Sequence, residues 1–191
     1  MSNFTPRLTA PGWQNEYYRH PGYYFAGEDG LNTCIVIDAN NGYVLPNCVG
    51  YAWGRAYEIL GSAPALCQGD AYLWWTYNDG YPRGSQPKLG AIVCTTYPNP
   101  GHVAVVERQD GPYEWTISES IYGGAEFRLG TIAYSIPNQA WFCWYDDGHG
   151  GTYNPWDVKG FIYPPYDIYN VGEFKLFGAG HKRIRRRKIY V

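Results

Sequence analysis

The feature that most constrains the fold is one strongly helical segment in a chain that otherwise consists of short apolar runs. Asn47 is a favourable residue for the N-cap of a helix, and Gly61 is a natural C-cap. Between them the apolar side chains recur at helical spacing, at Val49, Ala52, Trp53, Ala56, Ile59 and Leu60. The spacing predicts an α-helix that begins at Cys48 and ends before Gly61.

The rest of the chain predicts short elements joined by many turns, since it contains 24 Gly and 14 Pro. A second, shorter helix is expected at 71–75, capped by Asp70. Helices followed by an antiparallel meander of strands are typical of the α+β class. The predicted strands are 34–37, 89–95, 101–107, 113–121, 128–135 and 161–163.

Charge is distributed unevenly along the 191 residues, although the net charge is only −2. All 17 acidic residues lie before Lys182, together with nine of the 15 basic ones, which gives this part a charge of −8. The last ten residues carry +6. Two interpretations of this basic tail stay open: attraction to an anionic polymer or membrane surface, or a solvated chain end. Its cations are Lys182, Arg183, Arg185, Arg186, Arg187 and Lys188.

Composition excludes several classes of function. The net charge argues against a dedicated nucleic-acid binder, and the apolar runs are far too short to span a bilayer. The first residues, MSNFTPRLTAPGW, lack the apolar stretch of a secretory signal peptide. We therefore expect a protein that is made in the cytoplasm and does not leave it unaided by the general secretory route.

The five cysteines show no CxxC pair and no metal-ligand spacing. An odd number leaves at least one thiol unpaired within the chain, and in a reducing cytosol all five are expected to be free. No metal site and no cofactor are predicted. We interpret four of the cysteines as structural, at positions 34, 67, 94 and 143.

Cys48 is the candidate nucleophile, because the start of a helix favours the thiolate form. His102 begins an apolar strand directly after a glycine, and a neighbouring base would activate the thiol. Glu119 is an acid within an otherwise uncharged strand, WTISESI, and needs a partner there. A hairpin that turns near residues 110–111 would place His102 and Glu119 opposite each other. Nucleophile, base and orienting carboxylate in this order indicate amidase chemistry.

Each of these residues also has a purely structural interpretation. A cysteine at a helix start is usually a small core residue, and a histidine in a strand is more often structural than catalytic. Glu119 could simply pair with an arginine across the sheet. The catalytic interpretation depends on the joint order and spacing of the three residues.

The segments PNCVGYAWGRAYEI, PKLGAIVC, GHVAVVE and ISES resemble the CHAP domain, the cysteine, histidine-dependent amidohydrolase/peptidase family. The resemblance implies a papain-like α+β fold with N-terminal helices packed on an antiparallel sheet. It implies Cys48 as nucleophile, His102 as general base and acid, and Glu119 as orienting carboxylate. By this resemblance residues 1–168 are the catalytic domain, and residues 169–191 are a short extension with the basic tail.

Two positions depart from the family pattern. Many relatives have an asparagine shortly after the carboxylate, where this chain has Ser120 and Ile121. Some phage relatives bind calcium through acidic residues ahead of the cysteine, where this chain offers only Asp38, so that calcium is not supported.

Three more residues are candidates for binding the substrate. Asn47 could contribute to an oxyanion hole with the Cys48 N–H, or serve only as the N-cap. Trp141 and Trp144 could line a groove for a glycan-peptide substrate, or belong to the core or to loop packing.

The resemblance implies a peptidoglycan hydrolase that cleaves an amide bond of the bacterial cell wall. The bond could belong to an N-acetylmuramoyl-L-alanine amidase or to a peptide endopeptidase. We expect a phage lysin, which reaches the wall after holin release or from the virion. The alternatives are a non-catalytic wall- or virion-binding module on a decayed fold, and a housekeeping amidase with another substrate.

Overall fold

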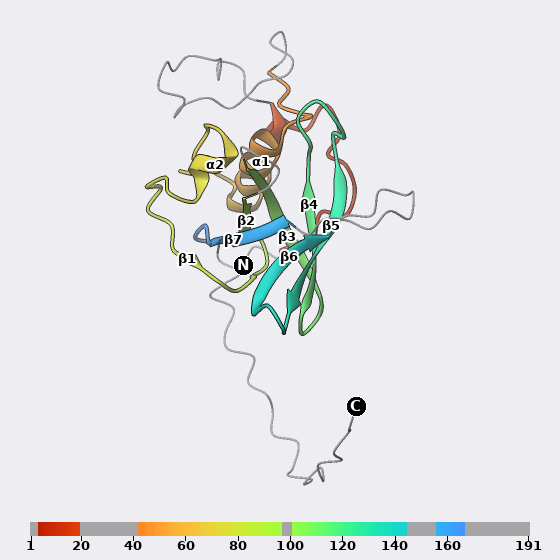
Figure 1. Ribbon diagram of the computed structural model, residues 1–191. Helices are drawn as coiled ribbons and strands as arrows, with labels where there is room; N and C mark the ends of the chain where they lie inside the picture. The colour runs from red at the N-terminus through yellow and green to blue at the C-terminus, as the bar shows by residue number, and fades with distance from the viewer. Residues whose placement is uncertain (1–3, 20–41, 97–100, 145–155, 167–191) are drawn as a thin grey trace, which may run out of the picture.

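The computed structural model describes residues 4–19, 42–96, 101–144 and 156–166, in which two short α-helices accompany an antiparallel sheet (Figure 1). The α+β class expected from the sequence is confirmed. In chain order the elements are η1 (Glu16–Tyr18), α1 (Cys48–Leu60), α2 (Ala71–Trp74), β1 (Arg83–Gly84), β2 (Ile92–Thr95), β3 (His102–Gly111), β4 (Glu114–Glu119), β5 (Arg128–Ser135), β6 (Ala140–Trp144) and β7 (Trp156–Ile162).

Helix α1 has the ends that its sequence predicts. The Asn47 side chain accepts a hydrogen bond of 3.0 Å from the Gly50 N–H, so that it caps the first turn. At the other end Gly61 adopts the left-handed conformation, with φ of 70°, and its N–H donates to the Tyr57 carbonyl. The helix therefore begins at Cys48 because of the residue before it.

The sheet is curved and closes on itself. Its strand order is β1-β7-β2-β3-β4-β5-β6, and β6 also pairs with β7. All of these pairings are antiparallel. Strand β3 is therefore a central strand, with β2 on one side and β4 on the other.

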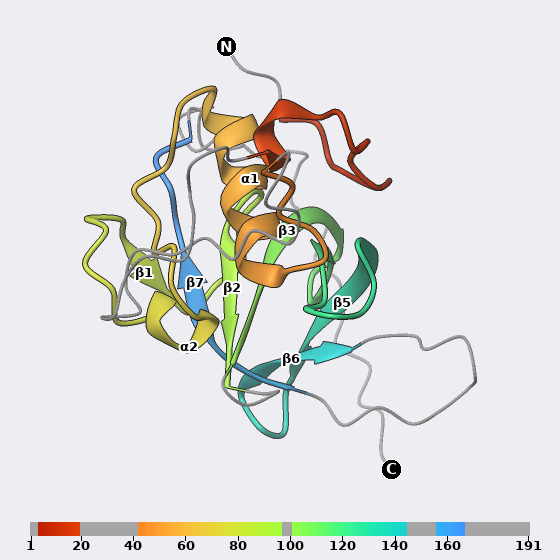
Figure 2. The ribbon, with the colours of Figure 1, turned by 90° about the horizontal axis from the view of Figure 1, so that it is seen from above.

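Two hydrophobic cores lie on the two sides of this sheet. Helix α1 lies over β2 and β3 (Figure 2), and its buried side chains pack with Val103 and Val105 of β3. The alternate residues Ala104 and Val106 belong to the second core, together with Ile117 of β4. The first six residues of β3 are buried because both of its faces are covered.

Several predicted boundaries were wrong. The second helix is only four residues long, and the Asp70 side chain makes no capping hydrogen bond. Strand β2 begins at Ile92 rather than Leu89, because Gly90, with φ of 76°, forms a turn that precedes it. The predicted strand at 34–37, the domain boundary at 168 and the basic tail lie outside the described residues.

Two strands were not predicted at all. β1 is an edge strand of only two residues, too short for a pattern. β6 was considered only as part of an aromatic block, and the turn before it uses Gln139 at φ of 51° instead of a glycine. Its signal in the sequence was therefore weak.

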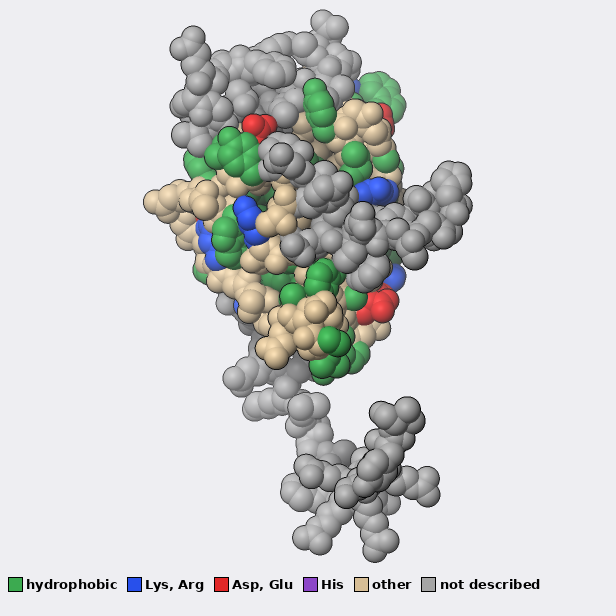
Figure 3. Space-filling model, viewed as in Figure 1, with side chains coloured by type: hydrophobic (Ala, Val, Ile, Leu, Met, Phe, Trp, Pro, Cys, Tyr) green, Lys and Arg blue, Asp and Glu red, His purple; other side chains and the backbone are tan. Residues whose placement is uncertain are grey.

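The surface of the described part is mixed in character. On the face shown in Figure 3, basic, acidic and hydrophobic side chains are interspersed over the described residues. Within the described ranges, no helix has the length and hydropathy that crossing a membrane requires.

The close approach of the N-terminal segment to α1 gives a first prediction. A Cβ added at Gly54 would lie 2.5 Å from the Tyr17 carbonyl oxygen and 2.9 Å from the Tyr18 ring. We expect Gly54→Ala to lower the free energy of unfolding by about 1–3 kcal/mol, because the segment must move away from the helix. Chemical denaturation measures this change.

The matched control is Gly12→Ala, since a Cβ at Gly12 would have no atom within 4 Å. It should leave stability nearly unchanged. Equal effects of the two substitutions would contradict the close packing of residues 17–18 on α1.

Candidate active site

Cys48 is the first residue of α1, and its side chain is partly buried and forms no disulfide. The backbone N–H groups of a first helical turn have no partner within the helix, and they carry the positive end of its dipole. The Cys48 side chain therefore lies at the positive end of the helix.

His102 is the first residue of β3 and follows Gly101, whose φ of 117° favours glycine. The imidazole is almost completely buried, with 3% exposed. Its Nε2 lies 2.5 Å from Glu119 Oε2. Nδ1 is therefore the ring nitrogen left to face the Cys48 thiol, with which His102 also forms a side-chain hydrogen bond.

The predicted direct pairing of His102 with Glu119 across the hairpin was wrong, although the two side chains do meet. Bulges in the β3–β4 ladder shift the register, so that Val105 pairs with Ser118. Continued toward the end of β4, this register puts Glu119 opposite Ala104. His102 lies two residues from Ala104, and such diagonal neighbours are within reach of long side chains.

Glu119 is fully buried, and its two oxygens bond to different partners. Oε2 faces His102, and Oε1 accepts a hydrogen bond from Arg128 Nε. Arg128 is the cross-strand partner of Glu119 in the β4–β5 ladder. The two interpretations of Glu119, as an orienting carboxylate and as the partner of an arginine, thus describe one arrangement.

An arginine partner for Glu119 was expected as an alternative, but its position in the chain was not predicted. The signal was present, since Arg128 opens the next predicted strand after Glu119. A buried carboxylate requires a cation or hydrogen-bond donors, which makes the nearest cross-strand arginine the natural choice.

The environment of His102 favours its charged form. Burial opposes the imidazolium, but Coulombic attraction to Cys48 and Glu119 and hydrogen bonds with both outweigh it, so that the pKa of His102 rises from 6.5 to about 10. Elsewhere in the fold, burial raises the pKa of the Cys94 thiol to about 12. Cys48 therefore differs from the buried Cys94 in having an imidazole beside it.

Asn47 is held at the start of α1 by both its side chain and its backbone. Its Oδ1 caps the helix, while its backbone N–H donates to Ser120 Oγ over 2.9 Å. The N-cap interpretation is therefore confirmed. Any oxyanion role is left to the Nδ2 amide, which makes no hydrogen bond to the described residues.

The structure does not bring Trp141 to Cys48. Trp141 pairs with Tyr134, six residues along β5 from Arg128, which corresponds to about 20 Å of strand. Its ring is 8% exposed and packs on Tyr134 and Phe161 in the second core. The core interpretation accounts for Trp141, and the Trp144 side chain lies outside what the structure describes.

The described residues contain no group of three or more His, Cys, Asp or Glu side chains that could hold a metal ion. Asp38, the acidic residue ahead of Cys48, lies outside the described residues.

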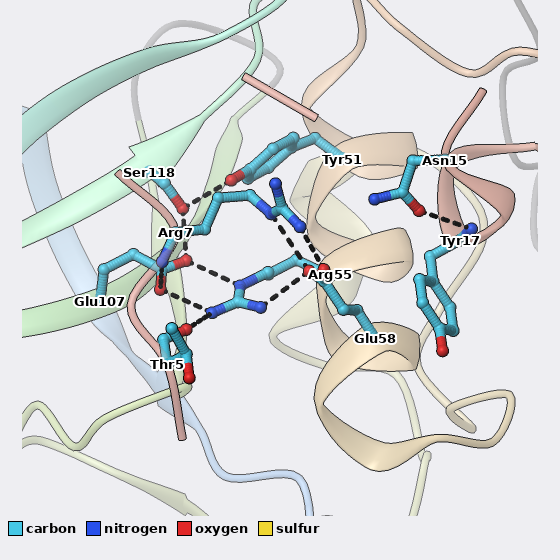
Figure 4. A network of polar contacts seen from close by, with 9 residues as sticks. All are labelled: Thr5, Arg7, Asn15, Tyr17, Tyr51, Arg55, Glu58, Glu107 and Ser118. Carbon is cyan, nitrogen blue, oxygen red and sulfur yellow. Dashed lines mark hydrogen bonds and ion pairs between the residues drawn. The ribbon is translucent and has the colours of Figure 1, made fainter. Parts of the chain in front are cut away.

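A buried polar network behind the site was missed by sequence analysis (Figure 4). Glu107 of β3 is fully buried and receives two hydrogen bonds from Arg55 of α1, of 3.0 and 2.9 Å. Ser118 of β4 donates to the same carboxylate, and the Arg7 backbone N–H does so from the N-terminal segment. Glu58 pairs with both arginines. The elements that carry Cys48, His102 and Glu119 are thus also connected here.

The sequence signal for this network was limited to Glu107, an acid at the end of an apolar run. Its main partner, Arg55, is 52 positions earlier in the chain. Only the packing of α1 on β3 brings the two together.

Comparison with known proteins identifies one family. The family model of the CHAP domain matches residues 38–120. No curated protein matches the chain.

A similar solved structure is the 2.15 Å crystal structure of an N-acetylmuramoyl-L-alanine amidase from Staphylococcus aureus. It is 24% identical, with a TM-score of 0.36, and the match covers 56% of this chain and 33% of that chain. This chain thus aligns with about a third of the amidase's length. The segment that is similar to the CHAP domain contains Cys48, His102 and Glu119.

Proposed function

We propose that this protein is a cysteine-dependent hydrolase that cleaves an amide bond in bacterial peptidoglycan, with Cys48, His102 and Glu119 as its catalytic residues. The observation that carries the proposal is the position of His102. Its buried ring lies between the thiol at the start of α1 and the Glu119 carboxylate. A structural histidine would not need both a nucleophile and an orienting acid as its neighbours.

The reacting form is the thiolate–imidazolium pair, in which the Cys48 thiol has given its proton to His102 Nδ1. The thiolate attacks the amide carbonyl and forms a C–S bond, and the carbonyl oxygen takes the negative charge. The Cys48 N–H and the Asn47 Nδ2 amide stabilise this oxyanion. His102 then returns its proton to the leaving amine as the C–N bond breaks, and water hydrolyses the thioester that remains.

Glu119 and Arg128 prepare His102 for this cycle. Arg128 binds one oxygen of the carboxylate and thereby leaves the other directed at His102 Nε2. The carboxylate fixes the orientation of the ring and stabilises its charged form. Arg128 itself is a positioning residue, since it acts through Glu119.

The proposal extends to the setting of the reaction. The substrate is either the bond between N-acetylmuramic acid and L-alanine or a peptide bond of the stem or cross-bridge. We propose a phage lysin that reaches the wall after holin release or from the virion. The basic tail, Lys182–Val191, would hold it to anionic wall polymers.

The first test replaces the nucleophile. Cys48→Ala should reduce the rate at which purified cell walls lose turbidity by several orders of magnitude, because no thioester can form. The matched control is Cys67→Ala, which removes a buried thiol away from His102 and should retain lysis. Lysis by Cys48→Ala at the wild-type rate would refute the catalytic assignment, and a wild type that leaves walls intact would favour a binding module.

Mass spectrometry of the digested walls identifies the bond. A free stem peptide with a new N-terminal alanine indicates an amidase, and a cleaved cross-bridge indicates an endopeptidase. Peptidoglycan that stays intact while other amides are cleaved would support a housekeeping amidase instead.

The raised pKa of His102 predicts a pH dependence. The imidazolium persists until the pH rises through about 10, so that the thiolate–imidazolium pair and the activity should decline there. The interactions that raise the pKa of His102 also stabilise the fold, fully below its unfolded pKa of about 6.5, and that contribution is lost as the pH rises through about 10.

NMR titration of the His102 ring tests whether Cys48 raises the pKa of His102. In Cys48→Ala the attraction of the thiolate is absent while burial persists, so the pKa of His102 should fall. The same His102 pKa in wild type and Cys48→Ala would show that the thiol and the imidazole are not electrostatically coupled.

A further inference from the structure

Two serines flank Glu119 at the end of β4, and both are fully buried. Successive side chains of a strand point to opposite faces, so Ser118 and Ser120 share the face opposite that of Glu119. The Ser120 hydroxyl bonds to Asn47, the N-cap of α1, and the Ser118 hydroxyl bonds to Tyr51, in the turn that contains Cys48.

Ser120 fixes the residue before the nucleophile. Its Oγ accepts the Asn47 backbone N–H over 2.9 Å and donates to the Ala125 carbonyl over 3.2 Å. The Ile121 N–H also donates to the Ala125 carbonyl, and this hydrogen bond closes the loop that follows β4. One hydroxyl therefore joins the start of α1, the end of β4 and the following loop.

Ser118 forms the second connection, one turn further along the helix. The Tyr51 hydroxyl donates to Ser118 Oγ over 2.8 Å, and Ser118 donates to Glu107 over 2.7 Å (Figure 4). Glu107 lies on β3, the strand that begins with His102, and is held there by Arg55 of α1. Ser118 thus connects all three elements of the site.

We propose that Ser118 and Ser120 are positioning residues that attach the first turn of α1 to β4 on both sides of Glu119, and so set the Cys48 sulfur relative to His102. The proposal rests on the proposed function. Ser120 directly follows Glu119 in the chain. Here it acts on the nucleophile's turn through the Asn47 backbone, without contacting the reacting atoms.

This role differs from a general contribution to stability. A thiolate that is displaced by up to about 1 Å from its working position attacks its substrate much more slowly, even when the protein is fully folded. Loss of either hydroxyl should therefore lower the reactivity of Cys48 under conditions in which the variant is still fully folded.

The test compares Ser118→Ala and Ser120→Ala with Thr116→Val. Thr116 lies on β4 like Ser118 and is also buried, but among the described residues its hydroxyl bonds only to the Arg108 and Asp110 side chains of β3. Ser120→Thr retains the hydroxyl and should rescue the effect. The readouts are kcat and KM on soluble peptidoglycan fragments, the rate of Cys48 alkylation by iodoacetamide across pH, and the melting temperature.

We expect kcat and the alkylation rate of both serine variants to fall by about tenfold or more, with KM nearly unchanged. Thr116→Val should keep both rates whatever its melting temperature, and Ser120→Thr should recover most of the loss. If Ser120→Ala does not fold, the rates of Ser118→Ala and Ser120→Thr can still be compared with those of Thr116→Val and the wild type.

Wild-type kcat and alkylation rates in Ser118→Ala and Ser120→Ala, with only a lower melting temperature, would overturn the proposal. Failure of the proposed function is a separate result. In that case the wild type does not cleave peptidoglycan, while the alkylation rates still report whether the serines position Cys48.

Discussion

The carboxylates of Glu107 and Glu119 are fully buried in the described part of the chain, and each requires compensation that determines how other elements pack. An unpaired buried charge costs several kcal/mol, so each carboxylate must have cations and hydrogen-bond donors around it. Glu107 obtains Arg55 from α1, and Glu119 obtains Arg128 from β5 and His102 from β3. Because these partners come from different elements, the pairing of the two carboxylates fixes the relative positions of the helix, the central strands and the proposed catalytic residues.

The parts of the fold that local chemistry determines could be predicted from the sequence. Helix α1 was predicted to the residue, because Asn47 and Gly61 act within one turn of the ends that they define. Strand β6 was missed, because its turn uses Gln139 rather than glycine. The direct pairing of His102 with Glu119 was wrong, because bulges in a ladder depend on tertiary packing.

In the site, too, the residues with a local signal in the sequence were predicted, and those that depend on tertiary packing were not. Cys48, His102 and Glu119 were identified from residue type, order and neighbours, and the structure brings them together. Arg128, Ser118 and Ser120 were not assigned, since an arginine or serine in a strand has many possible partners. Their contacts depend on how β4 packs against α1 and β5. Trp141 was considered for the substrate because it is aromatic, but its place in the strand order puts it in the second core.

The position of the N-terminal segment has a consequence for the size of the folding unit. Residues 4–19 precede the matched family segment, yet the Arg7 N–H and the Thr5 carbonyl both bond to the Glu107–Arg55 pair. Strands β5 and β7 follow that segment and are the outer neighbours of β4 and β2 in the sheet. An excised fragment of residues 38–120 would expose two strand edges and leave Arg55 and Glu107 with fewer partners. The smallest autonomous unit is therefore larger than the stretch by which the family is recognised, and it extends at both ends.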